Sequence, residues 1–85
     1  SIKRQNALTG AFLPGSEISI YDKANKWNTM RTCSIMKASG LVLYVKAGRD
    51  YGIFESMVPD GSQKAQRVSF TAIPLTDGIN EIILK

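Results

Sequence analysis

The sequence predicts an all-β protein, a single antiparallel β-sandwich of about seven short strands, with a small β-barrel as the alternative. Runs in which apolar and polar residues alternate recur about every ten residues. Nearly every gap between these runs holds glycine, proline, asparagine or aspartate, the residues that favour turns. The clearest pair of runs lies in 40–54, GLVLYVKAGRDYGIF, where a short turn separates two strand patterns. These features together favour a small β domain.

The N-terminal part of the chain is predicted to contain an arm and two strands. Residues 1–6 are polar and basic, so we expect a flexible arm or linker, with the sandwich domain spanning 7–85. A short strand is predicted over 7–12, followed by a turn at Pro14-Gly15. Residues 17–22, EISIYD, alternate regularly and predict the next strand.

The segment 24–38 allows two interpretations. Trp27, Met30, Cys33 and Met36 have the spacing of one helical face, which would suit a helix over 24–38. Threonines and asparagines weaken that helix, however, and no capping residue supports it. We therefore favour an irregular loop over 23–30 followed by a strand over 31–36.

The central stretch alternates Leu41, Leu43 and Val45 with more polar neighbours, and the pattern resumes at Tyr51 after a turn. We expect 40–54 to form the central hairpin of the sandwich and to serve as a scaffold. The second strand of this hairpin is predicted to run on to residue 57 or 58. A polar loop follows over 59–66, and two further strands are predicted over 67–75 and 80–85. Pro74 suggests that the strand over 67–75 leaves its sheet there.

Composition excludes several kinds of chemistry. The chain has no histidine, which excludes Ser-His and Cys-His catalysis and histidine-containing metal sites. The single cysteine, Cys33, cannot form an internal disulfide and is expected to be a structural thiol. The seven acidic residues never adopt the spacing of a catalytic pair or a calcium loop. We therefore predict no enzyme activity, no cofactor and no metal.

Charge and hydropathy limit the classes of partner that the chain is expected to bind. Eleven lysines and arginines against seven acids leave a net charge of +4, but the cations are scattered along the chain. A dedicated nucleic-acid binder more often clusters them, so nucleic acid is the less favoured partner. No apolar run approaches the ~20 residues that span a bilayer, so membrane insertion is not expected.

The order of turns and strands resembles carboxypeptidase-regulatory-like, or prealbumin-like, β-sandwich modules. Pro14, Gly15 and Ser16 match their first turn, and the alternating residues after it match their first strand. The remaining matches lie in the central stretch and its turn, at Gly40, Leu41, Leu43, Val45, Gly48 and Tyr51. The chain departs from the pattern where Lys37-Ala38 replaces the usual Thr-Asp and where Arg49-Asp50 adds a residue. The resemblance implies a prealbumin-like or immunoglobulin-like accessory module without catalytic residues, found in cell-surface, secreted or phage structural proteins.

The candidate binding residues are Lys23, Lys26, Trp27 and Arg31, which form the one aromatic and basic cluster in an irregular segment. An indole among cations could stack on a sugar or a base, or anchor a protein interface. The competing interpretation is that Trp27 folds back over the open end of the core.

Two functions remain. The first is a non-catalytic structural, adhesion or assembly module of a larger cell-surface, secreted or virion protein, whose partners are a protein, a glycan or neighbouring domains. An unpaired strand edge or an exposed Trp27 could also support a homo-oligomer. The alternative is a small basic β-barrel that binds single-stranded nucleic acid. Of these we favour the first, with an extracellular, cell-surface or virion location.

Overall fold

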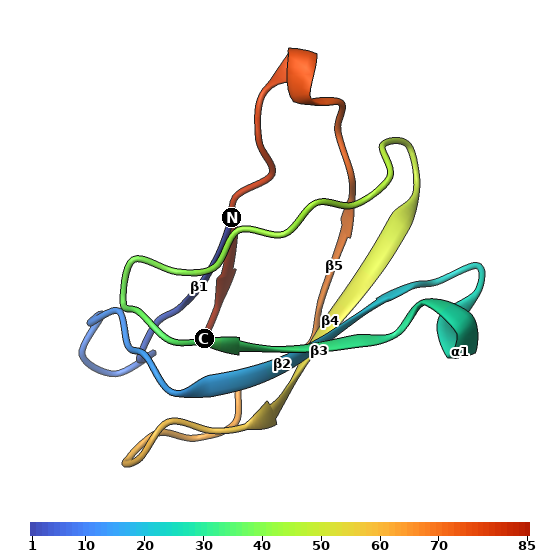
Figure 1. The fold of residues 1–85 in the computed structure, drawn as a ribbon. Helices are drawn as coiled ribbons and strands as arrows, with labels where there is room; N and C mark the ends of the chain where they lie inside the picture. The colour runs from blue at the N-terminus through green and yellow to red at the C-terminus, as the bar shows by residue number, and fades with distance from the viewer.

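The computed structural model describes the backbone of residues 1–85 and every side chain except that of Trp27. Its larger layer is a four-stranded antiparallel sheet with the order β3-β2-β4-β5 (Figure 1). The central strands are β2 (Ser16–Asp22) and β4 (Asp50–Met57), and the edges are β3 (Arg31–Ile35) and β5 (Val68–Thr71). The predicted all-β sandwich is therefore confirmed, with six strands in place of about seven.

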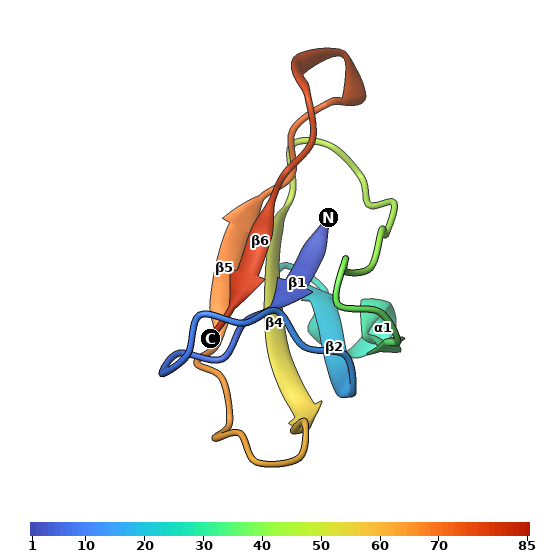
Figure 2. The ribbon, with the colours of Figure 1, turned by 90° about the vertical axis from the view of Figure 1, so that its left-hand side faces the viewer.

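The second layer is small and joins the two ends of the chain. Strands β1 (Ile2–Arg4) and β6 (Ile82–Leu84) pair in parallel, with Ile2 opposite Ile82 (Figure 2). An isolated antiparallel bridge between Ile2 and Leu41 brings the stretch after Gly40 to the other side of β1. The layer thus has the order 41–46, β1, β6, although only its last two members form a ladder.

The core lies between the two layers and is built mainly from isoleucine. In β2, Ile18 and Ile20 are fully buried, as their alternation predicts. Tyr51 stacks on Phe70 with ring centroids 5.7 Å apart and closes one side of the core. The buried apolar residues are Ile2, Ile18, Ile20, Ile35, Tyr51, Ile53, Ala65, Ala72, Ile82 and Leu84.

A buried ion pair links the two layers. The Arg4 Nε of β1 donates to the Glu55 carboxylate of β4 at 2.8 Å, and both side chains are almost fully buried. The Ser16 hydroxyl (2.5 Å) and the Ala65 N–H (2.9 Å) also donate to this carboxylate. Burial alone would raise the pKa of Glu55, but these three donors and the positive charge of Arg4 together hold it below its ordinary value.

The N-terminus departs from its predicted structure. Residues 2–4, expected in a flexible arm, form β1, because Ile2 fills the core and Arg4 meets Glu55. The strand predicted over 7–12 is instead a turn, since the Asn6 carboxamide oxygen accepts the N–H groups of the second and third residues after it, at 2.8 and 3.1 Å.

The predicted central hairpin is half wrong. Strand β4 is central, but its partners are β2 and β5, so 41–46 has no place beside it. That stretch crosses to the second layer after Gly40, whose φ of +100° only glycine adopts readily. The alternation within it is real, because Leu43 and Val45 are half-buried while Val42 and Tyr44 are exposed.

The segment 23–38 forms a single helical turn, α1 (Lys26–Thr29), and then β3, which confirms the loop-then-strand interpretation over the long helix. The Thr29 hydroxyl donates to the Asn25 carbonyl and accepts the Asp22 N–H, which holds the turn against β2. The strand predicted over 67–75 already ends at Thr71, and a 3-10 turn, η1 (Leu75–Asp77), follows Pro74. Among the described residues no helix is long and apolar enough to cross a membrane.

Candidate functional site

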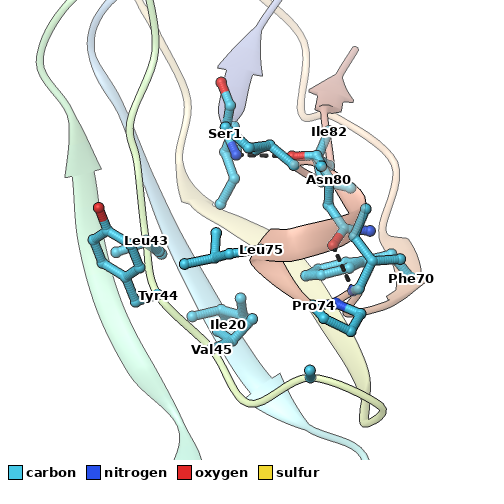
Figure 3. Close-up of a pocket in the computed structure, with 15 residues that line it drawn as sticks. Ser1, Ile20, Leu43, Tyr44, Val45, Phe70, Pro74, Leu75, Asn80 and Ile82 are labelled. Carbon is cyan, nitrogen blue, oxygen red and sulfur yellow. Dashed lines mark hydrogen bonds between the residues drawn. The ribbon is translucent and has the colours of Figure 1, made fainter.

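An apolar cleft of about 350 Å³ lies at the open end of the sandwich (Figure 3). One wall is the stretch 43–47, with Leu43 and Val45 facing inward, and the other wall is the loop 73–80. Ile20 of β2 and Phe70 of β5 also line it. The cleft therefore exposes the core at the point where the small second layer fails to cover the large sheet.

Large apolar side chains extend from the cleft onto the surface. Tyr44 is 74% exposed, Leu75 71% and Ile79 63%, and all three line the cleft. Single exposed apolar residues are ordinary, but a contiguous set around a hollow is typical of an interaction site. The cleft and its rim are thus the strongest candidate for a binding surface.

The loop wall is held in place by Asn80. Its side-chain amide donates to the Thr71 carbonyl at 3.0 Å and accepts the Ile73 N–H at 3.0 Å. Its main-chain carbonyl accepts from the Ser1 nitrogen at 2.8 Å, which ties the loop to β1. Figure 3 shows the hydrogen bonds that join Asn80 to Ser1 and to Ile73 along one side of the cleft. The wall is therefore preorganised and needs no partner to take its shape.

A second hollow, shallow and about 340 Å³ in volume, adjoins the cleft and shares Tyr44 and Val45 with it. Three cations line it, Arg31 of β3 with Lys46 and Arg49. We call this surface the cationic hollow. The Arg31 guanidinium donates to the Tyr44 carbonyl at 3.1 Å, and the Lys46 N–H donates to the Tyr51 hydroxyl at 3.0 Å.

One carboxylate balances part of this charge. Arg49 donates to Asp22 at 2.8 Å, and this bond is the main reason that the pKa of Asp22 lies below its ordinary value. Asp22 is thus ionised at neutral pH, and the three cations leave a local excess of positive charge. The hollow is suited to an acidic group on a partner.

The predicted binding cluster is only partly assembled. Arg31 lines the cationic hollow, whereas Lys23 is exposed and lines neither hollow. The Lys26 ammonium lies 5.1 Å above the Tyr21 ring centroid, and the Trp27 side chain lies outside the described part of the structure. Sequence reasoning missed Lys46 and Arg49, although their place on either side of the Ala47-Gly48 turn was an available signal.

The site offers charge, hydrogen bonds and apolar surface to a partner. Within the described residues no group of three cysteine, aspartate or glutamate side chains is placed to hold a metal ion. The thiol of Cys33 is half-buried in β3 and lines neither hollow. The arrangement can therefore bind a partner, and we assign it no catalytic step.

Comparison with solved structures identifies the fold. Over 98% of its length the chain superposes on the shaft pilin SpaA of Lactobacillus rhamnosus GG, with a TM-score of 0.62 and 14% identity. The chain has the fold of a pilin β-sandwich domain. It spans 42% of that pilin chain, but 90% of a structure of the pilin's C-terminal domain, with a TM-score of 0.61 and 14% identity. No protein-family model and no curated protein sequence matches it.

Proposed function

We propose that this chain is a non-catalytic structural and assembly module of a cell-surface protein. The observation that carries the proposal is the superposition of 98% of the chain on 90% of the pilin's C-terminal domain, so that the two correspond as whole domains. A shared fold alone does not specify a function, and the surface features of this chain add further support.

Two features of the chain support a structural role. The Arg4–Glu55 pair joins the layers through buried, charge-assisted hydrogen bonds, which fix how β1 sits on the large sheet. The apolar cleft and the cationic hollow lie side by side and share Tyr44 and Val45, as expected of a surface that docks a polypeptide. We therefore propose another polypeptide or a neighbouring module as the partner, with an extracellular location.

The proposal is tested on the organism that produces the protein. Antibodies raised against the 85-residue chain should label intact cells as strongly as permeabilised cells, and brief protease treatment of intact cells should remove the signal. An antibody to a cytoplasmic protein, which should label only permeabilised cells, is the control. Labelling that appears only after permeabilisation would refute a surface module.

A further inference from the structure

The four-stranded sheet has two edges, β3 and β5, and the β5 edge is covered. Just after β5, the Ala72 N–H donates to the Arg49 carbonyl at 2.9 Å, so the backbone groups of Ala72 face β4. By alternation those of Thr71 face away from β4, and there the Thr71 carbonyl accepts the Asn80 side-chain amide at 3.0 Å. Covering an edge with a loop in this way protects a sheet from pairing with another chain.

The β3 edge has no such cover. The Ile35 carbonyl accepts the Gly15 N–H at 2.8 Å, so the backbone groups of Ile35 face the line of β2. By alternation those of Cys33 also face β2, whereas those of Thr32 and Ser34 face outward. Within the described part of the chain no hydrogen bond reaches these outward groups, and both residues are exposed. The backbone edge of β3 is therefore free to pair with another strand.

The residues of β3 do not obstruct such pairing. Edge strands are commonly protected by proline, by a bulge or by charged side chains, above all lysine. Residues 32–34 are threonine, cysteine and serine, which are small and uncharged, and the pairing of β3 with β2 has no register shift. Arg31 is the one charged residue of the strand, and its guanidinium bonds to the Tyr44 carbonyl at 3.1 Å.

We propose that β3 pairs antiparallel with β3 of a second copy of this chain, across a two-fold axis at Cys33. In this register Thr32 of each copy lies opposite Ser34 of the other, and each such pair exchanges two main-chain hydrogen bonds. No other two-fold register pairs all of Arg31–Ile35, because a shift in either direction leaves one end of the strand without a partner. The contact is the same on both copies, so it closes a dimer.

The residues next to the strand favour a second copy over another polypeptide. Continued by one residue at each end, this register places Met30 of one copy opposite Met36 of the other. Met36 is 82% exposed and, with Met57, lines a shallow hollow of about 430 Å³. Each copy would thus cover an exposed methionine of the other with an apolar side chain. The dimer goes beyond the proposed function, which does not require self-association, and its strand shares only Arg31 with the cationic hollow.

The dimer should be weak and should be strengthened by salt. One pair of short strands buries less than the roughly 1,000 Å² of a stable interface, so we expect a dissociation constant on the order of 0.1–1 mM. Each copy carries a net charge of +4, and salt screens the repulsion between them. Sedimentation of the reduced 85-residue chain should give a dissociation constant at least about threefold lower in ~0.5 M than in ~0.05 M NaCl. A dimer that weakens as salt is added would overturn the proposal.

Oxidative cross-linking through Cys33 tests the register. In the proposed pair the two Cys33 residues face each other without exchanging hydrogen bonds, so their Cα atoms lie about 4.5 Å apart, within the range of a disulfide. Diamide should therefore join the two thiols in an intermolecular disulfide and itself take up their two hydrogens. The control is Ser34→Cys in a Cys33→Ser chain. Its thiol is more exposed, but the two copies of residue 34 are offset along the strands beyond about 7 Å, so it should cross-link at least about fivefold more slowly.

Matched variants at the two sheet edges test the interface. Ser34→Pro removes one outward N–H and leaves the bonds between β3 and β2 in place. Ser69→Pro is its control, because Ser69 is also exposed and its backbone groups face away from β4 in the covered edge strand β5. We expect dimer at ~1 mM chain in the Ser69 variant and only monomer in the Ser34 variant. Ser34→Lys and Ser69→Lys repeat the comparison without a change of backbone.

Three results would overturn the proposal. They are a chain that stays monomeric at ~1 mM in high salt, faster cross-linking through residue 34 than through Cys33, and equal dimerisation of the Ser34 and Ser69 variants. Surface labelling of cells would be unaffected by any of them, which separates these failures from failure of the proposed function.

Discussion

Replacing Glu55 by glutamine tests how the two layers are held together. The substitution keeps the shape of the side chain and removes its charge, which leaves the Arg4 guanidinium buried without a counter-ion. The new amide also cannot accept from every donor that surrounds it, because its NH₂ group would meet Arg4, Ser16 or the Ala65 N–H. Breaking a buried pair in this way costs about 3–5 kcal/mol.

That loss is large for a domain of this size. At roughly 0.05–0.15 kcal/mol per residue, a chain of 85 residues has a free energy of unfolding of about 4–13 kcal/mol. At about 4–8 °C per kcal/mol, Glu55→Gln should lower the melting temperature by at least ~12 °C. Urea unfolding followed by circular dichroism at pH 7 measures the change as a lower midpoint with an unchanged slope.

A double variant separates the ion pair from simple packing. Arg4→Met with Glu55→Leu removes both charges, and it should recover most of the lost stability, because apolar replacement of a buried pair is often neutral or stabilising. It also keeps the prediction testable if the single variant does not fold. A loss below about 1 kcal/mol in the single variant, or a double variant no more stable than the single one, would refute the reasoning.

Acidification, two glycine substitutions and one arginine substitution test other parts of the structure. The pKa of Glu55 is lower in the folded protein, so its stabilising contribution is complete above the ordinary pKa of 4.5 and is lost as the pH falls through the folded pKa. The urea midpoint should therefore fall on acidification, and it should fall less in Glu55→Gln. A midpoint that rises would contradict this. Gly40→Ala should lower the melting temperature of the protein more than Gly48→Ala does. Both glycines have positive φ, but only at Gly40 would a Cβ come within 2.6 Å of the Ile2 carbonyl oxygen. Equal losses would show that this close approach is unimportant. Arg49→Ala should raise the pKa of Asp22 toward its ordinary value of 3.8, and NMR titration of the carboxyl group would detect this change. An unchanged titration would show that Arg49 does not lower the pKa of Asp22.

The strands are the part of the fold that the sequence predicts best. Local alternation with turn residues at both ends was enough to predict strands at 17–22, 31–36 and 51–57, and with them the all-β class. It failed at 7–12, where the Asn6 side chain forms a local turn that satisfies the same backbone groups. It also predicted a flexible arm over 1–6 and missed β1, because a strand of three residues is stabilised by distant partners such as Glu55 and Leu84.

The candidate site was likewise predictable from the sequence only in part. The sequence indicated that 23–31 carries cations in an irregular segment, and Arg31 lines the cationic hollow. It could not show that Lys46 and Arg49 join Arg31, since that proximity comes from the crossing of 41–46 to the second layer. The cleft beside them was equally hidden, because it exists only where that layer ends.

By itself, then, the sequence determined the period-two alternation, the positions of the main turns and the lack of histidine chemistry, all of which are local or compositional properties. Tertiary structure alone decided which strands are neighbours. The stretch 40–46 alternates as regularly as β2, yet β2 and β5 occupy both edges of β4, so this stretch lies in the other layer, where Leu41 pairs with Ile2. Pairing depends on which edges remain free once the other strands have docked, and no local pattern encodes that competition.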